Sequence, residues 1–424
     1  MPEELRAGIG ITNITPSLGA SLRGYYHERK AEGVHDDLLA KAVWLQDAEE
    51  AAVLVECDLI GLNTEVVSAA RKLIGERERL PADNVLLAAT HTHTGPGIDG
   101  EYADVLAVRI ADAVHMARLD ARPTRAEIAC GHEDSICFYR RFRMKDGTVQ
   151  TNPGHRNPNV LEPAGEVDPR IGIVSLSANG DAPLALLVNY ALHLDTVGGN
   201  VISADYPFFM GELLRRAVWP DLATIFLQGA AGNINHFDVF GRGPLKGFGE
   251  TQRIGTILAA EALKCTQKLE PLSAVPIRCA RREIELPVAE VSGEEAAEAK
   301  RILEKPAEPE KDFTMDRVRA RRAVRLAELG GKPVQTELQC IAVGDLAFVG
   351  IPGELFTELG RSIRDGSPFT HTFIVELAND SVGYIPHREA FDEGAYEVES
   401  SRFTPDVGER IVSEALAILQ ELAV

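Results

Sequence analysis

The sequence of 424 residues lacks the features that mark several large classes of protein. Its most apolar stretch, residues 182–194, is interrupted by Asn189 and His193 and is shorter than the ~18 residues that a membrane-spanning helix needs. The six cysteines form no CxxC pair, so neither a thiolate metal site nor a disulfide framework is indicated. Positive charge is scarce: 44 lysines and arginines face 64 acidic residues, and the net charge of −20 repels phosphate backbones and anionic lipids. We therefore expect neither a nucleic-acid partner nor membrane insertion.

Other signatures are missing as well. Glu3 and Glu4 lie at the start of the chain, and no apolar stretch of the kind that forms a secretory signal follows them. The scattered cysteines then fit reduced core residues, and we expect a cytoplasmic protein. No P-loop or GxSxG motif occurs, which leaves nucleotide-driven chemistry and the α/β-hydrolase elbow without support. Nothing repeats at a fixed period, so solenoids and propellers are excluded. The sequence does not reveal the oligomeric state.

What the sequence does contain is an alternation of apolar runs with segments of helical spacing. Residues 51–55 are five consecutive apolar residues, as in a strand covered on both faces. By this pattern the predicted strands are residues 7–12, 38–45, 51–60, 84–90, 171–176, 184–190, 223–228, 336–343, 346–351 and 372–377, and the predicted helices are residues 64–77, 102–117, 206–219 and 251–269. The alternation predicts an α/β fold, with mixed, largely buried β-sheets and flanking helices, in a single domain over residues 1–424.

The last third of the chain carries two further helical features. Residues 290–330 are rich in Ala, Glu, Arg and Lys around a proline-containing break, and they predict a helical-hairpin insertion with a solvated, charged face. Its simplest interpretation is a peripheral lid or spacer without chemistry. The chain ends in a helix, for which Thr404 is the expected N-cap and Pro405 the first helical residue.

The strongest local signal for chemistry is the pair His91 and His93, which ends the strand predicted over residues 84–90. Side chains two residues apart on a strand point to the same face, and ligands bind at the carboxyl edge of open α/β sheets. The sequence TGPG at residues 94–97 turns the chain sharply and leaves room beside the imidazoles. Imidazole is the commonest metal-ligating side chain, so the pair indicates a metal site, although two core or surface histidines would give the same pattern.

Three more polar residues lie just past predicted strands: His193, Glu354 and Tyr384. Singly, each has an ordinary explanation. His193 could be a satisfied core histidine and Glu354 an acidic first-turn residue of a helix, whereas Tyr384 alone says little. Together with the histidine pair they offer imidazoles, a carboxylate and a phenol, a donor set that suits Zn²⁺ with one position left open for water.

Two other segments could contact a substrate. The small residues of QGAAGN, residues 228–233, would let backbone N–H groups approach a substrate, and Asn233 could donate to a developing oxyanion; a tight turn after a strand is the alternative. Residues 139–145 include Arg140, Arg141 and Arg143, and Arg156 lies beyond them. Arginine suits bidentate binding of a carboxylate, sulfate or phosphate, and a plain solvated face is the alternative.

The order of these motifs resembles the catalytic domain of the neutral/alkaline, non-lysosomal ceramidases. The resemblance is carried, in chain order, by GIGITNITP at residues 8–16, THTHTGPG at 90–97, His193, QGAAGN at 228–233, PGE at 352–354, and LAN at 377–379 followed by Tyr384. It runs through nearly the whole chain, and THTHTGPG is its most specific element. The resemblance implies a zinc-dependent amidohydrolase.

The resemblance also implies roles for individual residues. The ligands of the zinc ion in that family match His91, His193, Glu354 and Tyr384 of this sequence. The second histidine of the HxH pair, His93, matches a pocket residue of that family, and Tyr396 matches a second pocket tyrosine. A pocket arginine matches Arg140, although Arg141 lies only one position away.

The sequence departs from that family in ways that bear on function. The ceramidases carry a serine with a proposed catalytic role in the loop after AGN, and Asn235 stands at the matching position. A side-chain amide cannot serve as that nucleophile, so water must take its role, and Asn235 can at most orient or polarise the substrate. The ceramidases also have a C-terminal immunoglobulin-like domain and are secreted or membrane-associated, whereas this chain ends at a predicted helix. We expect the metal site to be retained and the lipid substrate not to be.

The leading hypothesis is therefore a cytoplasmic Zn²⁺-dependent hydrolase that cleaves an amide or ester bond of a small, polar, anionic substrate. In it His93 acts as general base or acid, Arg140 orients the substrate, and Asn233 stabilises the oxyanion. One alternative is metal-assisted processing of an acidic carbohydrate held by the arginine cluster. Another is a non-catalytic, ceramidase-like binding protein that has lost its activity together with the serine.

Overall fold

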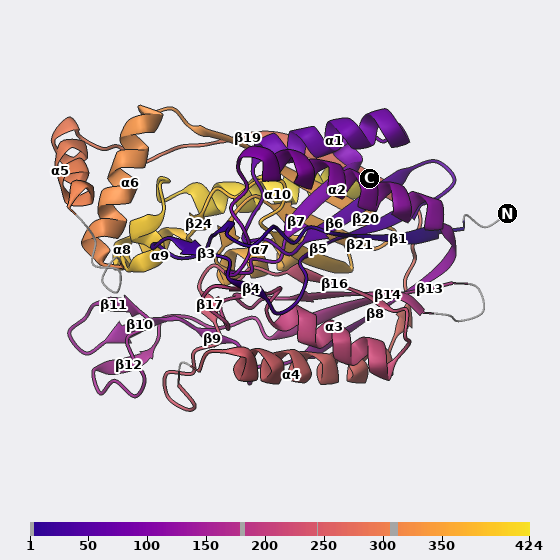
Figure 1. Ribbon diagram of the computed structural model, residues 1–424, viewed down its shortest axis with the longest axis horizontal. Coiled ribbons are helices and arrows are strands. Elements are labelled where there is room, and N and C mark those ends of the chain that lie inside the picture. Colours follow the sequence, from indigo (N-terminus) through magenta and orange to yellow (C-terminus); the bar gives the residue numbers. More distant parts are fainter. Residues whose placement is uncertain (1–3, 179–182, 244, 306–312) are drawn as a thin grey trace.

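The computed structural model describes residues 4–178, 183–243, 245–305 and 313–424, and two stacked β-sheets with helices on their outer faces form its body (Figure 1). The α/β fold with mixed sheets and flanking helices that the sequence predicts is confirmed. Among the described residues, no helix has the length and hydropathy needed to cross a membrane.

The larger sheet has nine strands. Their order is β16 (Ala223–Gln228), β14 (Pro183–Tyr190), β13 (Arg170–Ala178), β8 (Arg122–His132), β1 (Arg6–Asn13), β5 (Leu39–Gln46), β6 (Ala51–Cys57) and β7 (Val85–Ala89), with β18 (Glu270–Pro271) beside β8. Neighbouring strands are antiparallel except for the parallel pairs β14–β16 and β6–β7. The apolar runs that predicted these four strands are almost entirely buried, because each lies between two layers.

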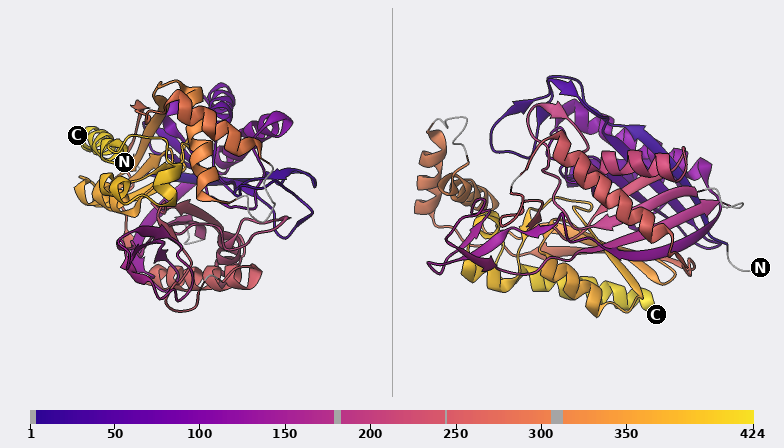
Figure 2. Two further views of the ribbon diagram at one scale, coloured as in Figure 1. Left: turned by 90° about the vertical axis from the view of Figure 1, so that its left-hand side faces the viewer. Right: turned by 90° about the horizontal axis from the view of Figure 1, so that it is seen from below.

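The smaller sheet has four strands and packs on the inner face of the larger one. Its order is β19 (Ile277–Leu286), β20 (Val334–Val343), β21 (Leu346–Ile351) and β23 (His371–Glu376). Phe348 and Phe373 from this sheet share one apolar core with Leu54, Val174 and Ile225 from the other. On its outer side lie the helices α7 (Thr357–Gly366) and α10 (Val407–Ala423), and Figure 2 (right) shows α10, in yellow, along one side of the sheets.

Four helices cover the outer face of the larger sheet: α1 (Thr64–Glu78), α2 (Gly100–Asp120), α3 (Tyr206–Ala217) and α4 (Phe248–Thr266). Helix α2 lies directly on β1, where Gly8 and Gly10 leave room for its backbone. A Cβ atom at Gly10 would lie 2.0 Å from the carbonyl oxygen of Ala113 in α2. The two glycines of GIGITNITP therefore allow a close helix–strand contact.

Parallel strand pairs bring the motif-bearing loops to one edge of the body. Two parallel strands end on the same side, so β6–β7, β14–β16 and β21–β23 each deliver two loops to one edge. Backbone hydrogen bonds then join the sheets at this edge: Ala89 N–H donates to Leu377, at 3.2 Å, and Asn379 N–H donates to Leu87, at 2.7 Å. The segments that follow β7 and β23 are thereby held side by side.

The predicted hairpin is present as α5 (Gly293–Glu304) and α6 (Met315–Leu329), which lie between the paired strands β19 and β20 and project from one end of the body (Figure 1). Helix α5 starts with a capping box formed by Ser292 and Glu295. Thr314 is the N-cap of α6, and Gly330, in the left-handed conformation, is its C-cap. The proline-containing break between them lies mostly outside the described residues.

The remaining elements are short. They are β2 (Ser21–Leu22), β3 (Arg29–Lys30), β4 (Gly33–Val34), η1 (Ala82–Asn84), β9 (Phe138–Tyr139), β10 (Arg141–Met144), β11 (Val149–Thr151), β12 (Val160–Pro163), β15 (Val201–Ile202), β17 (Ile234–Asn235), β22 (Glu354–Leu355), β24 (Tyr384–Ile385), α8 (Arg388–Glu393) and α9 (Tyr396–Ser400).

Some local predictions are wrong, for identifiable reasons. Strands β8 and β19 were not predicted, because polar residues interrupt their apolar ones. The last helix begins at Val407 after Asp406, and Thr404 instead donates its hydroxyl hydrogen to the Asp406 carboxylate, so Thr404 is not the N-cap. All six cysteines are free, as expected, but Cys130 is exposed rather than part of the core.

The contact between β1 and α2 can be tested by one added methyl group. We expect Gly10→Ala to lower the free energy of unfolding by about 2–3 kcal/mol, because the helix backbone must move to admit the Cβ atom. Gly33→Ala is the matched control, since nothing lies within 4 Å of the added atom, and we expect a change below about 0.5 kcal/mol. Denaturant unfolding of both variants measures the difference, and equal stabilities would contradict the contact.

Candidate metal centre and cavity

His91 follows β7 and is held by the segment that follows β6. Its backbone N–H donates to the carbonyl of Leu59 at 2.8 Å, and its Nδ1 lies 2.7 Å from the carbonyl oxygen of Ile60. Because a carbonyl oxygen only accepts, Nδ1 carries the proton and Nε2 presents its lone pair. His91 also has a φ of +80°, a conformation that side chains other than glycine rarely adopt. These constraints aim Nε2 at one point.

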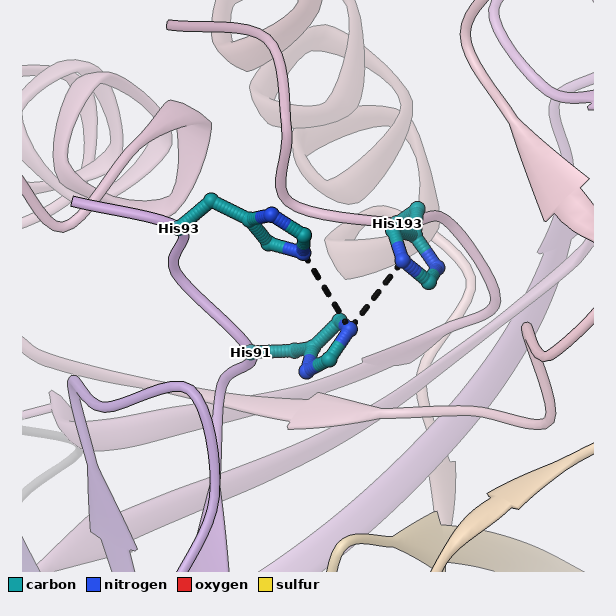
Figure 3. A group of neighbouring side chains, drawn as sticks. All are labelled: His91, His93 and His193. Atoms are coloured by element: carbon teal, nitrogen blue, oxygen red, sulfur yellow. Dashed lines mark hydrogen bonds between the residues drawn. The ribbon is translucent and has the colours of Figure 1, made fainter. Parts of the chain in front are cut away.

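Two further imidazoles meet His91 at this point (Figure 3). The Nε2 of His91 lies 3.1 Å from Nε2 of His193 and 3.4 Å from Nε2 of His93. The backbone N–H of His93 donates to the carbonyl of Leu194, which ties the loop after β7 to the loop after β14. Each imidazole offers a ring nitrogen within 4.8 Å of the others, and such a group could hold a metal ion.

Glu354 reaches the same point from the segment that follows β21, and Tyr384 lies beside Glu354. The Oε2 of Glu354 lies 3.5 Å from Nε2 of His91 and 3.8 Å from Nε2 of His193. Glu354 and Tyr384 are direct partners in the parallel pair β22–β24, which follows β21 and β23. The structure therefore brings together the four residues that the motif comparison implies as metal ligands, from four separate segments of the chain.

This donor set fits a divalent cation. The Oε2 of Glu354 is buried and has no hydrogen-bond partner, and the Nε2 lone pair of His91 faces two other ring nitrogens. Imidazole nitrogens and carboxylate or phenol oxygens are ligands that Zn²⁺ accepts. His93 supplies a third imidazole at the same distance range, so the geometry alone also permits a set that includes His93.

The protonation states of these groups suit metal binding too. Burial lowers the pKa of His193 well below its usual value and lowers the pKa of His93 to about 4, so both imidazoles are neutral at pH 7. Burial would raise the pKa of Glu354, but His91 and Arg140 outweigh it and hold this pKa below its usual value. Neutral imidazoles and an ionised carboxylate are the forms that ligate metals.

A cavity of about 1140 Å³ opens over the histidines, and this volume exceeds that of most small-molecule sites. His93, His193 and Tyr384 line the part of the cavity next to the candidate metal centre, here called its floor, whereas His91 and Glu354 are not part of the lining. The walls combine aromatic, cationic and polar side chains: Tyr25, Tyr26, His27, Arg140, Asp195, Asn235, His236, Phe237, Lys246, Phe313, Met315, Arg319 and Tyr396. The candidate metal centre is therefore open to a sizeable ligand.

Arg140, and not Arg141, faces the cavity. The Arg140 Nε lies 2.7 Å from Glu397 Oε1, and its guanidinium donates to the carbonyl of Gly232 at 2.6 Å. Arg141 is fully buried on the other side of the same carboxylate, with Nη1 3.2 Å from Glu397 Oε2 and Nη2 3.0 Å from Glu393. Neither arginine lies on a solvated face, which was the alternative reading of this segment.

The two asparagines differ in their relation to the cavity. Asn233 is buried and does not line the cavity: its amide donates to Tyr139 and Glu358, and its oxygen accepts from the N–H of Thr357. The amide of Asn233 thus joins β9 to the first turn of α7 and is not available to an oxyanion. Asn235 does line the cavity, but its amide donates to Asn152 and accepts from the N–H of Phe237.

Tyr396 also lines the cavity. Its hydroxyl lies 3.1 Å from that of Tyr26, and its ring lies 5.5 Å, between centroids, from the ring of Tyr384. The predicted pocket tyrosine is therefore beside the candidate metal ligand.

Comparison with solved structures identifies the fold. The neutral ceramidase from Pseudomonas aeruginosa matches with a TM-score of 0.79 at 21% sequence identity, over 100% of this chain and 76% of that chain. A ceramidase complexed with C2 matches with a TM-score of 0.76 at 18% identity, over 99% of this chain and 76% of that chain. The chain has the neutral ceramidase fold. No family model matches the sequence, and no curated protein matches it.

Within this fold, the cavity walls contain residues that sequence reasoning missed. Tyr25 and Tyr26 lie in a short aromatic segment next to Gly24, and Asp195 follows His193 by two residues. Their nearness in sequence to these residues is the signal that could have identified all three. Phe237 and Lys246 come from a loop without periodicity, and nothing in the sequence points to them.

The helical hairpin contributes to the cavity as well. Phe313, Met315 and Arg319 line its wall, and the ring of Phe313 lies 5.5 Å from Tyr26 and 5.6 Å from Tyr396. The hairpin therefore forms part of the cavity wall, which agrees with the lid and not with the spacer of the sequence interpretation.

Glu397 offers a test of the arrangement that orients Arg140. We expect Glu397→Ala to lower the free energy of unfolding by about 3–5 kcal/mol, because two buried guanidinium groups lose their shared carboxylate. Glu298→Ala removes a surface ion pair with Arg301 and should cost less than about 1 kcal/mol. Thermal and denaturant unfolding measure both losses, and a small loss for Glu397→Ala would mean that Arg140 is not held in this way.

Proposed function

We propose that the chain is a metal-dependent hydrolase that cleaves an amide or ester bond of a small, anionic substrate. The proposal rests on one observation: ligand-type side chains from separate segments, His91, His193, Glu354 and Tyr384, gather beside a large cavity, which His193 and Tyr384 line. Both solved structures reported above with the same fold are ceramidases, which supports a hydrolytic reaction.

These four residues would hold the metal ion, and Zn²⁺ suits their nitrogen and oxygen donors. Such an ion, when bound, polarises a carbonyl group and lowers the pKa of a water ligand toward ~7. In the net reaction the bond from the carbonyl carbon to nitrogen or oxygen breaks, the oxygen of water joins that carbon, and the leaving atom takes a proton.

The side chains around the cavity floor would transfer that proton and orient the substrate. His93 lies on the cavity floor with Nε2 3.4 Å from Nε2 of His91, so we assign it the role of accepting the proton of water and passing it to the leaving atom. Arg140 is fixed by Glu397 and by the Gly232 carbonyl, and it would hold the substrate by charge and by hydrogen bonds. Tyr396 would contribute a hydroxyl from the wall.

The backbone, rather than Asn233, is the remaining candidate for oxyanion stabilisation, because the Asn233 amide is already engaged. Asn235 would shape the wall beside its partner Asn152. A carboxamide is not a nucleophile, so the proposed reaction uses water directly and forms no bond between enzyme and substrate.

Metal content tests the proposed ligands. We expect the purified protein to contain one divalent cation per chain, and His91→Ala and Glu354→Ala each to lower the bound metal by at least about tenfold, since a ligand is lost. His132→Ala changes an exposed imidazole and should retain the metal. Elemental analysis after dialysis against a chelator measures this, and metal-free wild-type protein with chelator-insensitive hydrolysis would contradict the proposal.

Metal content and activity together distinguish a general base from a metal ligand at His93. We expect His93→Ala to retain the metal while kcat for amide hydrolysis falls by about 10²- to 10⁴-fold, which is the usual effect of losing a general base. Loss of the metal in this variant would instead make His93 a ligand. Hydrolysis is followed by the release of amine from a panel of N-acyl compounds.

A further inference from the structure

One wall of the cavity carries a lysine held between two aromatic rings. The Nζ of Lys246 lies 2.7 Å from Asp195 Oδ2 and 3.3 Å from the hydroxyl of Tyr25. It also lies 5.4 Å from the ring centroid of Tyr25 and 5.5 Å from that of Phe237. The side chain is 38% exposed and lines the cavity, so its ammonium group is both positioned by partners and accessible to a ligand.

A second cation also lies against the ring of Tyr25. The guanidinium carbon of Arg29 is 4.2 Å from the Tyr25 ring centroid, and the residue is only 4% exposed. Its hydrogen bonds go to the backbone carbonyls of Arg23, His93 and Gly199, and no ion pair found among the described residues includes it.

Two cations, Arg29 and Lys246, and one carboxylate, Asp195, contact Tyr25 directly, and the carboxylate of Asp205 also acts on the Tyr25 hydroxyl through its charge. Two cations against one ring contrast with the net charge of −20 of the whole chain. A buried cation without a carboxylate partner favours an anion nearby, because the interior screens charge weakly. The wall at Tyr25 is thus suited to an anionic group of a ligand.

The wall at Tyr25 is close to the candidate reaction centre. The Oδ1 of Asp195 lies 4.0 Å from Nδ1 of His93, and the ring centroids of Tyr25 and His93 are 5.7 Å apart. An anionic group bound beside Lys246 would then lie only a few bonds from the bond that is cleaved.

A different part of the cavity, beside Tyr384, is aromatic. Tyr26, Phe313 and Tyr396 line it with ring centroids 5.5 to 6.5 Å apart, and Tyr396 contacts Tyr384. Rings arranged in this way offer an apolar surface to a substituent of the substrate.

We propose that the substrate is an N-acylated amino acid, whose carboxylate binds Lys246 and whose apolar acyl group packs on Tyr26, Phe313 and Tyr396. The assignment rests on the proposed hydrolase function and adds the class of substrate. Hydrolysis breaks the C–N bond, adds the oxygen of water to the acyl carbon and releases a fatty or aryl carboxylate and a free amino acid.

The first experiment compares N-phenylacetylglycine with its carboxamide, N-phenylacetylglycinamide, on the Zn²⁺-loaded enzyme. We expect kcat/KM to be about 10- to 100-fold higher for the carboxylate, in the range that a hydrogen-bonded charge pair supplies. Lys246→Met should reduce this ratio at least tenfold, and Lys246→Arg should restore much of it. Lys268→Met, an exposed lysine outside the cavity lining, is the control and should keep the wild-type ratio.

The second experiment measures binding without hydrolysis. The ligands are the ketomethylene analogues of the two compounds, in which CH₂ replaces the amide NH, and calorimetry compares their affinities for wild type and Lys246→Met. Tighter binding of the carboxylate analogue to wild type than to Lys246→Met supports the inference, even if no hydrolysis is found. The absence of hydrolysis would count against the proposed function alone. Equal affinities of the two analogues would overturn the inference. So would a kcat/KM for the neutral amide that equals or exceeds that for the carboxylate, with the ratio of the two unchanged in Lys246→Met. Either result would leave the hydrolase proposal standing.

Discussion

The contact of the His91 imidazole with its neighbours is the constraint on which the rest of the site depends. Its Nε2 lies within 3.5 Å of His193, His93 and Glu354, which come from loops on both sheets. The strand pairs β6–β7, β14–β16 and β21–β23 are parallel, so their loops emerge at one edge, and the backbone hydrogen bonds between Leu87 or Ala89 and the segment after β23 hold the sheets together there. Stacking of the sheets therefore builds the site.

Much of this arrangement could be predicted because it depends on short-range patterns. Uninterrupted apolar runs identified the buried strands, and a polar residue directly after such a run marks a strand end, where α/β folds bind ligands. His91, His193 and Glu354 lie within three residues of such a run, whereas Tyr384 follows β23 by eight residues and was indicated only by the ordered motifs; the structure brings all four together. Strands with polar interruptions, such as β8 and β19, carry no such pattern, and they were missed.

Other features depend on tertiary partners that no local pattern contains. Arg140 and Arg141 are adjacent in sequence, yet only Arg140 reaches the cavity, because Glu397 binds one guanidinium on each of its oxygens. Asn233 was predicted to serve an oxyanion, but Glu358, Tyr139 and Thr357 take up its amide. The hairpin, whose charged sequence is typical of a solvated helix pair, lines the cavity through Phe313, Met315 and Arg319.

The central claim is that His91, His193, Glu354 and Tyr384 hold one metal ion. Its most direct test is a crystal structure of the purified protein with anomalous diffraction recorded at the zinc absorption edge. We expect a single strong anomalous peak at about 2.0–2.2 Å from Nε2 of His91, Nε2 of His193 and an oxygen of Glu354. The account would be contradicted if protein grown with Zn²⁺ showed no peak there and kept a direct hydrogen bond between the two imidazoles.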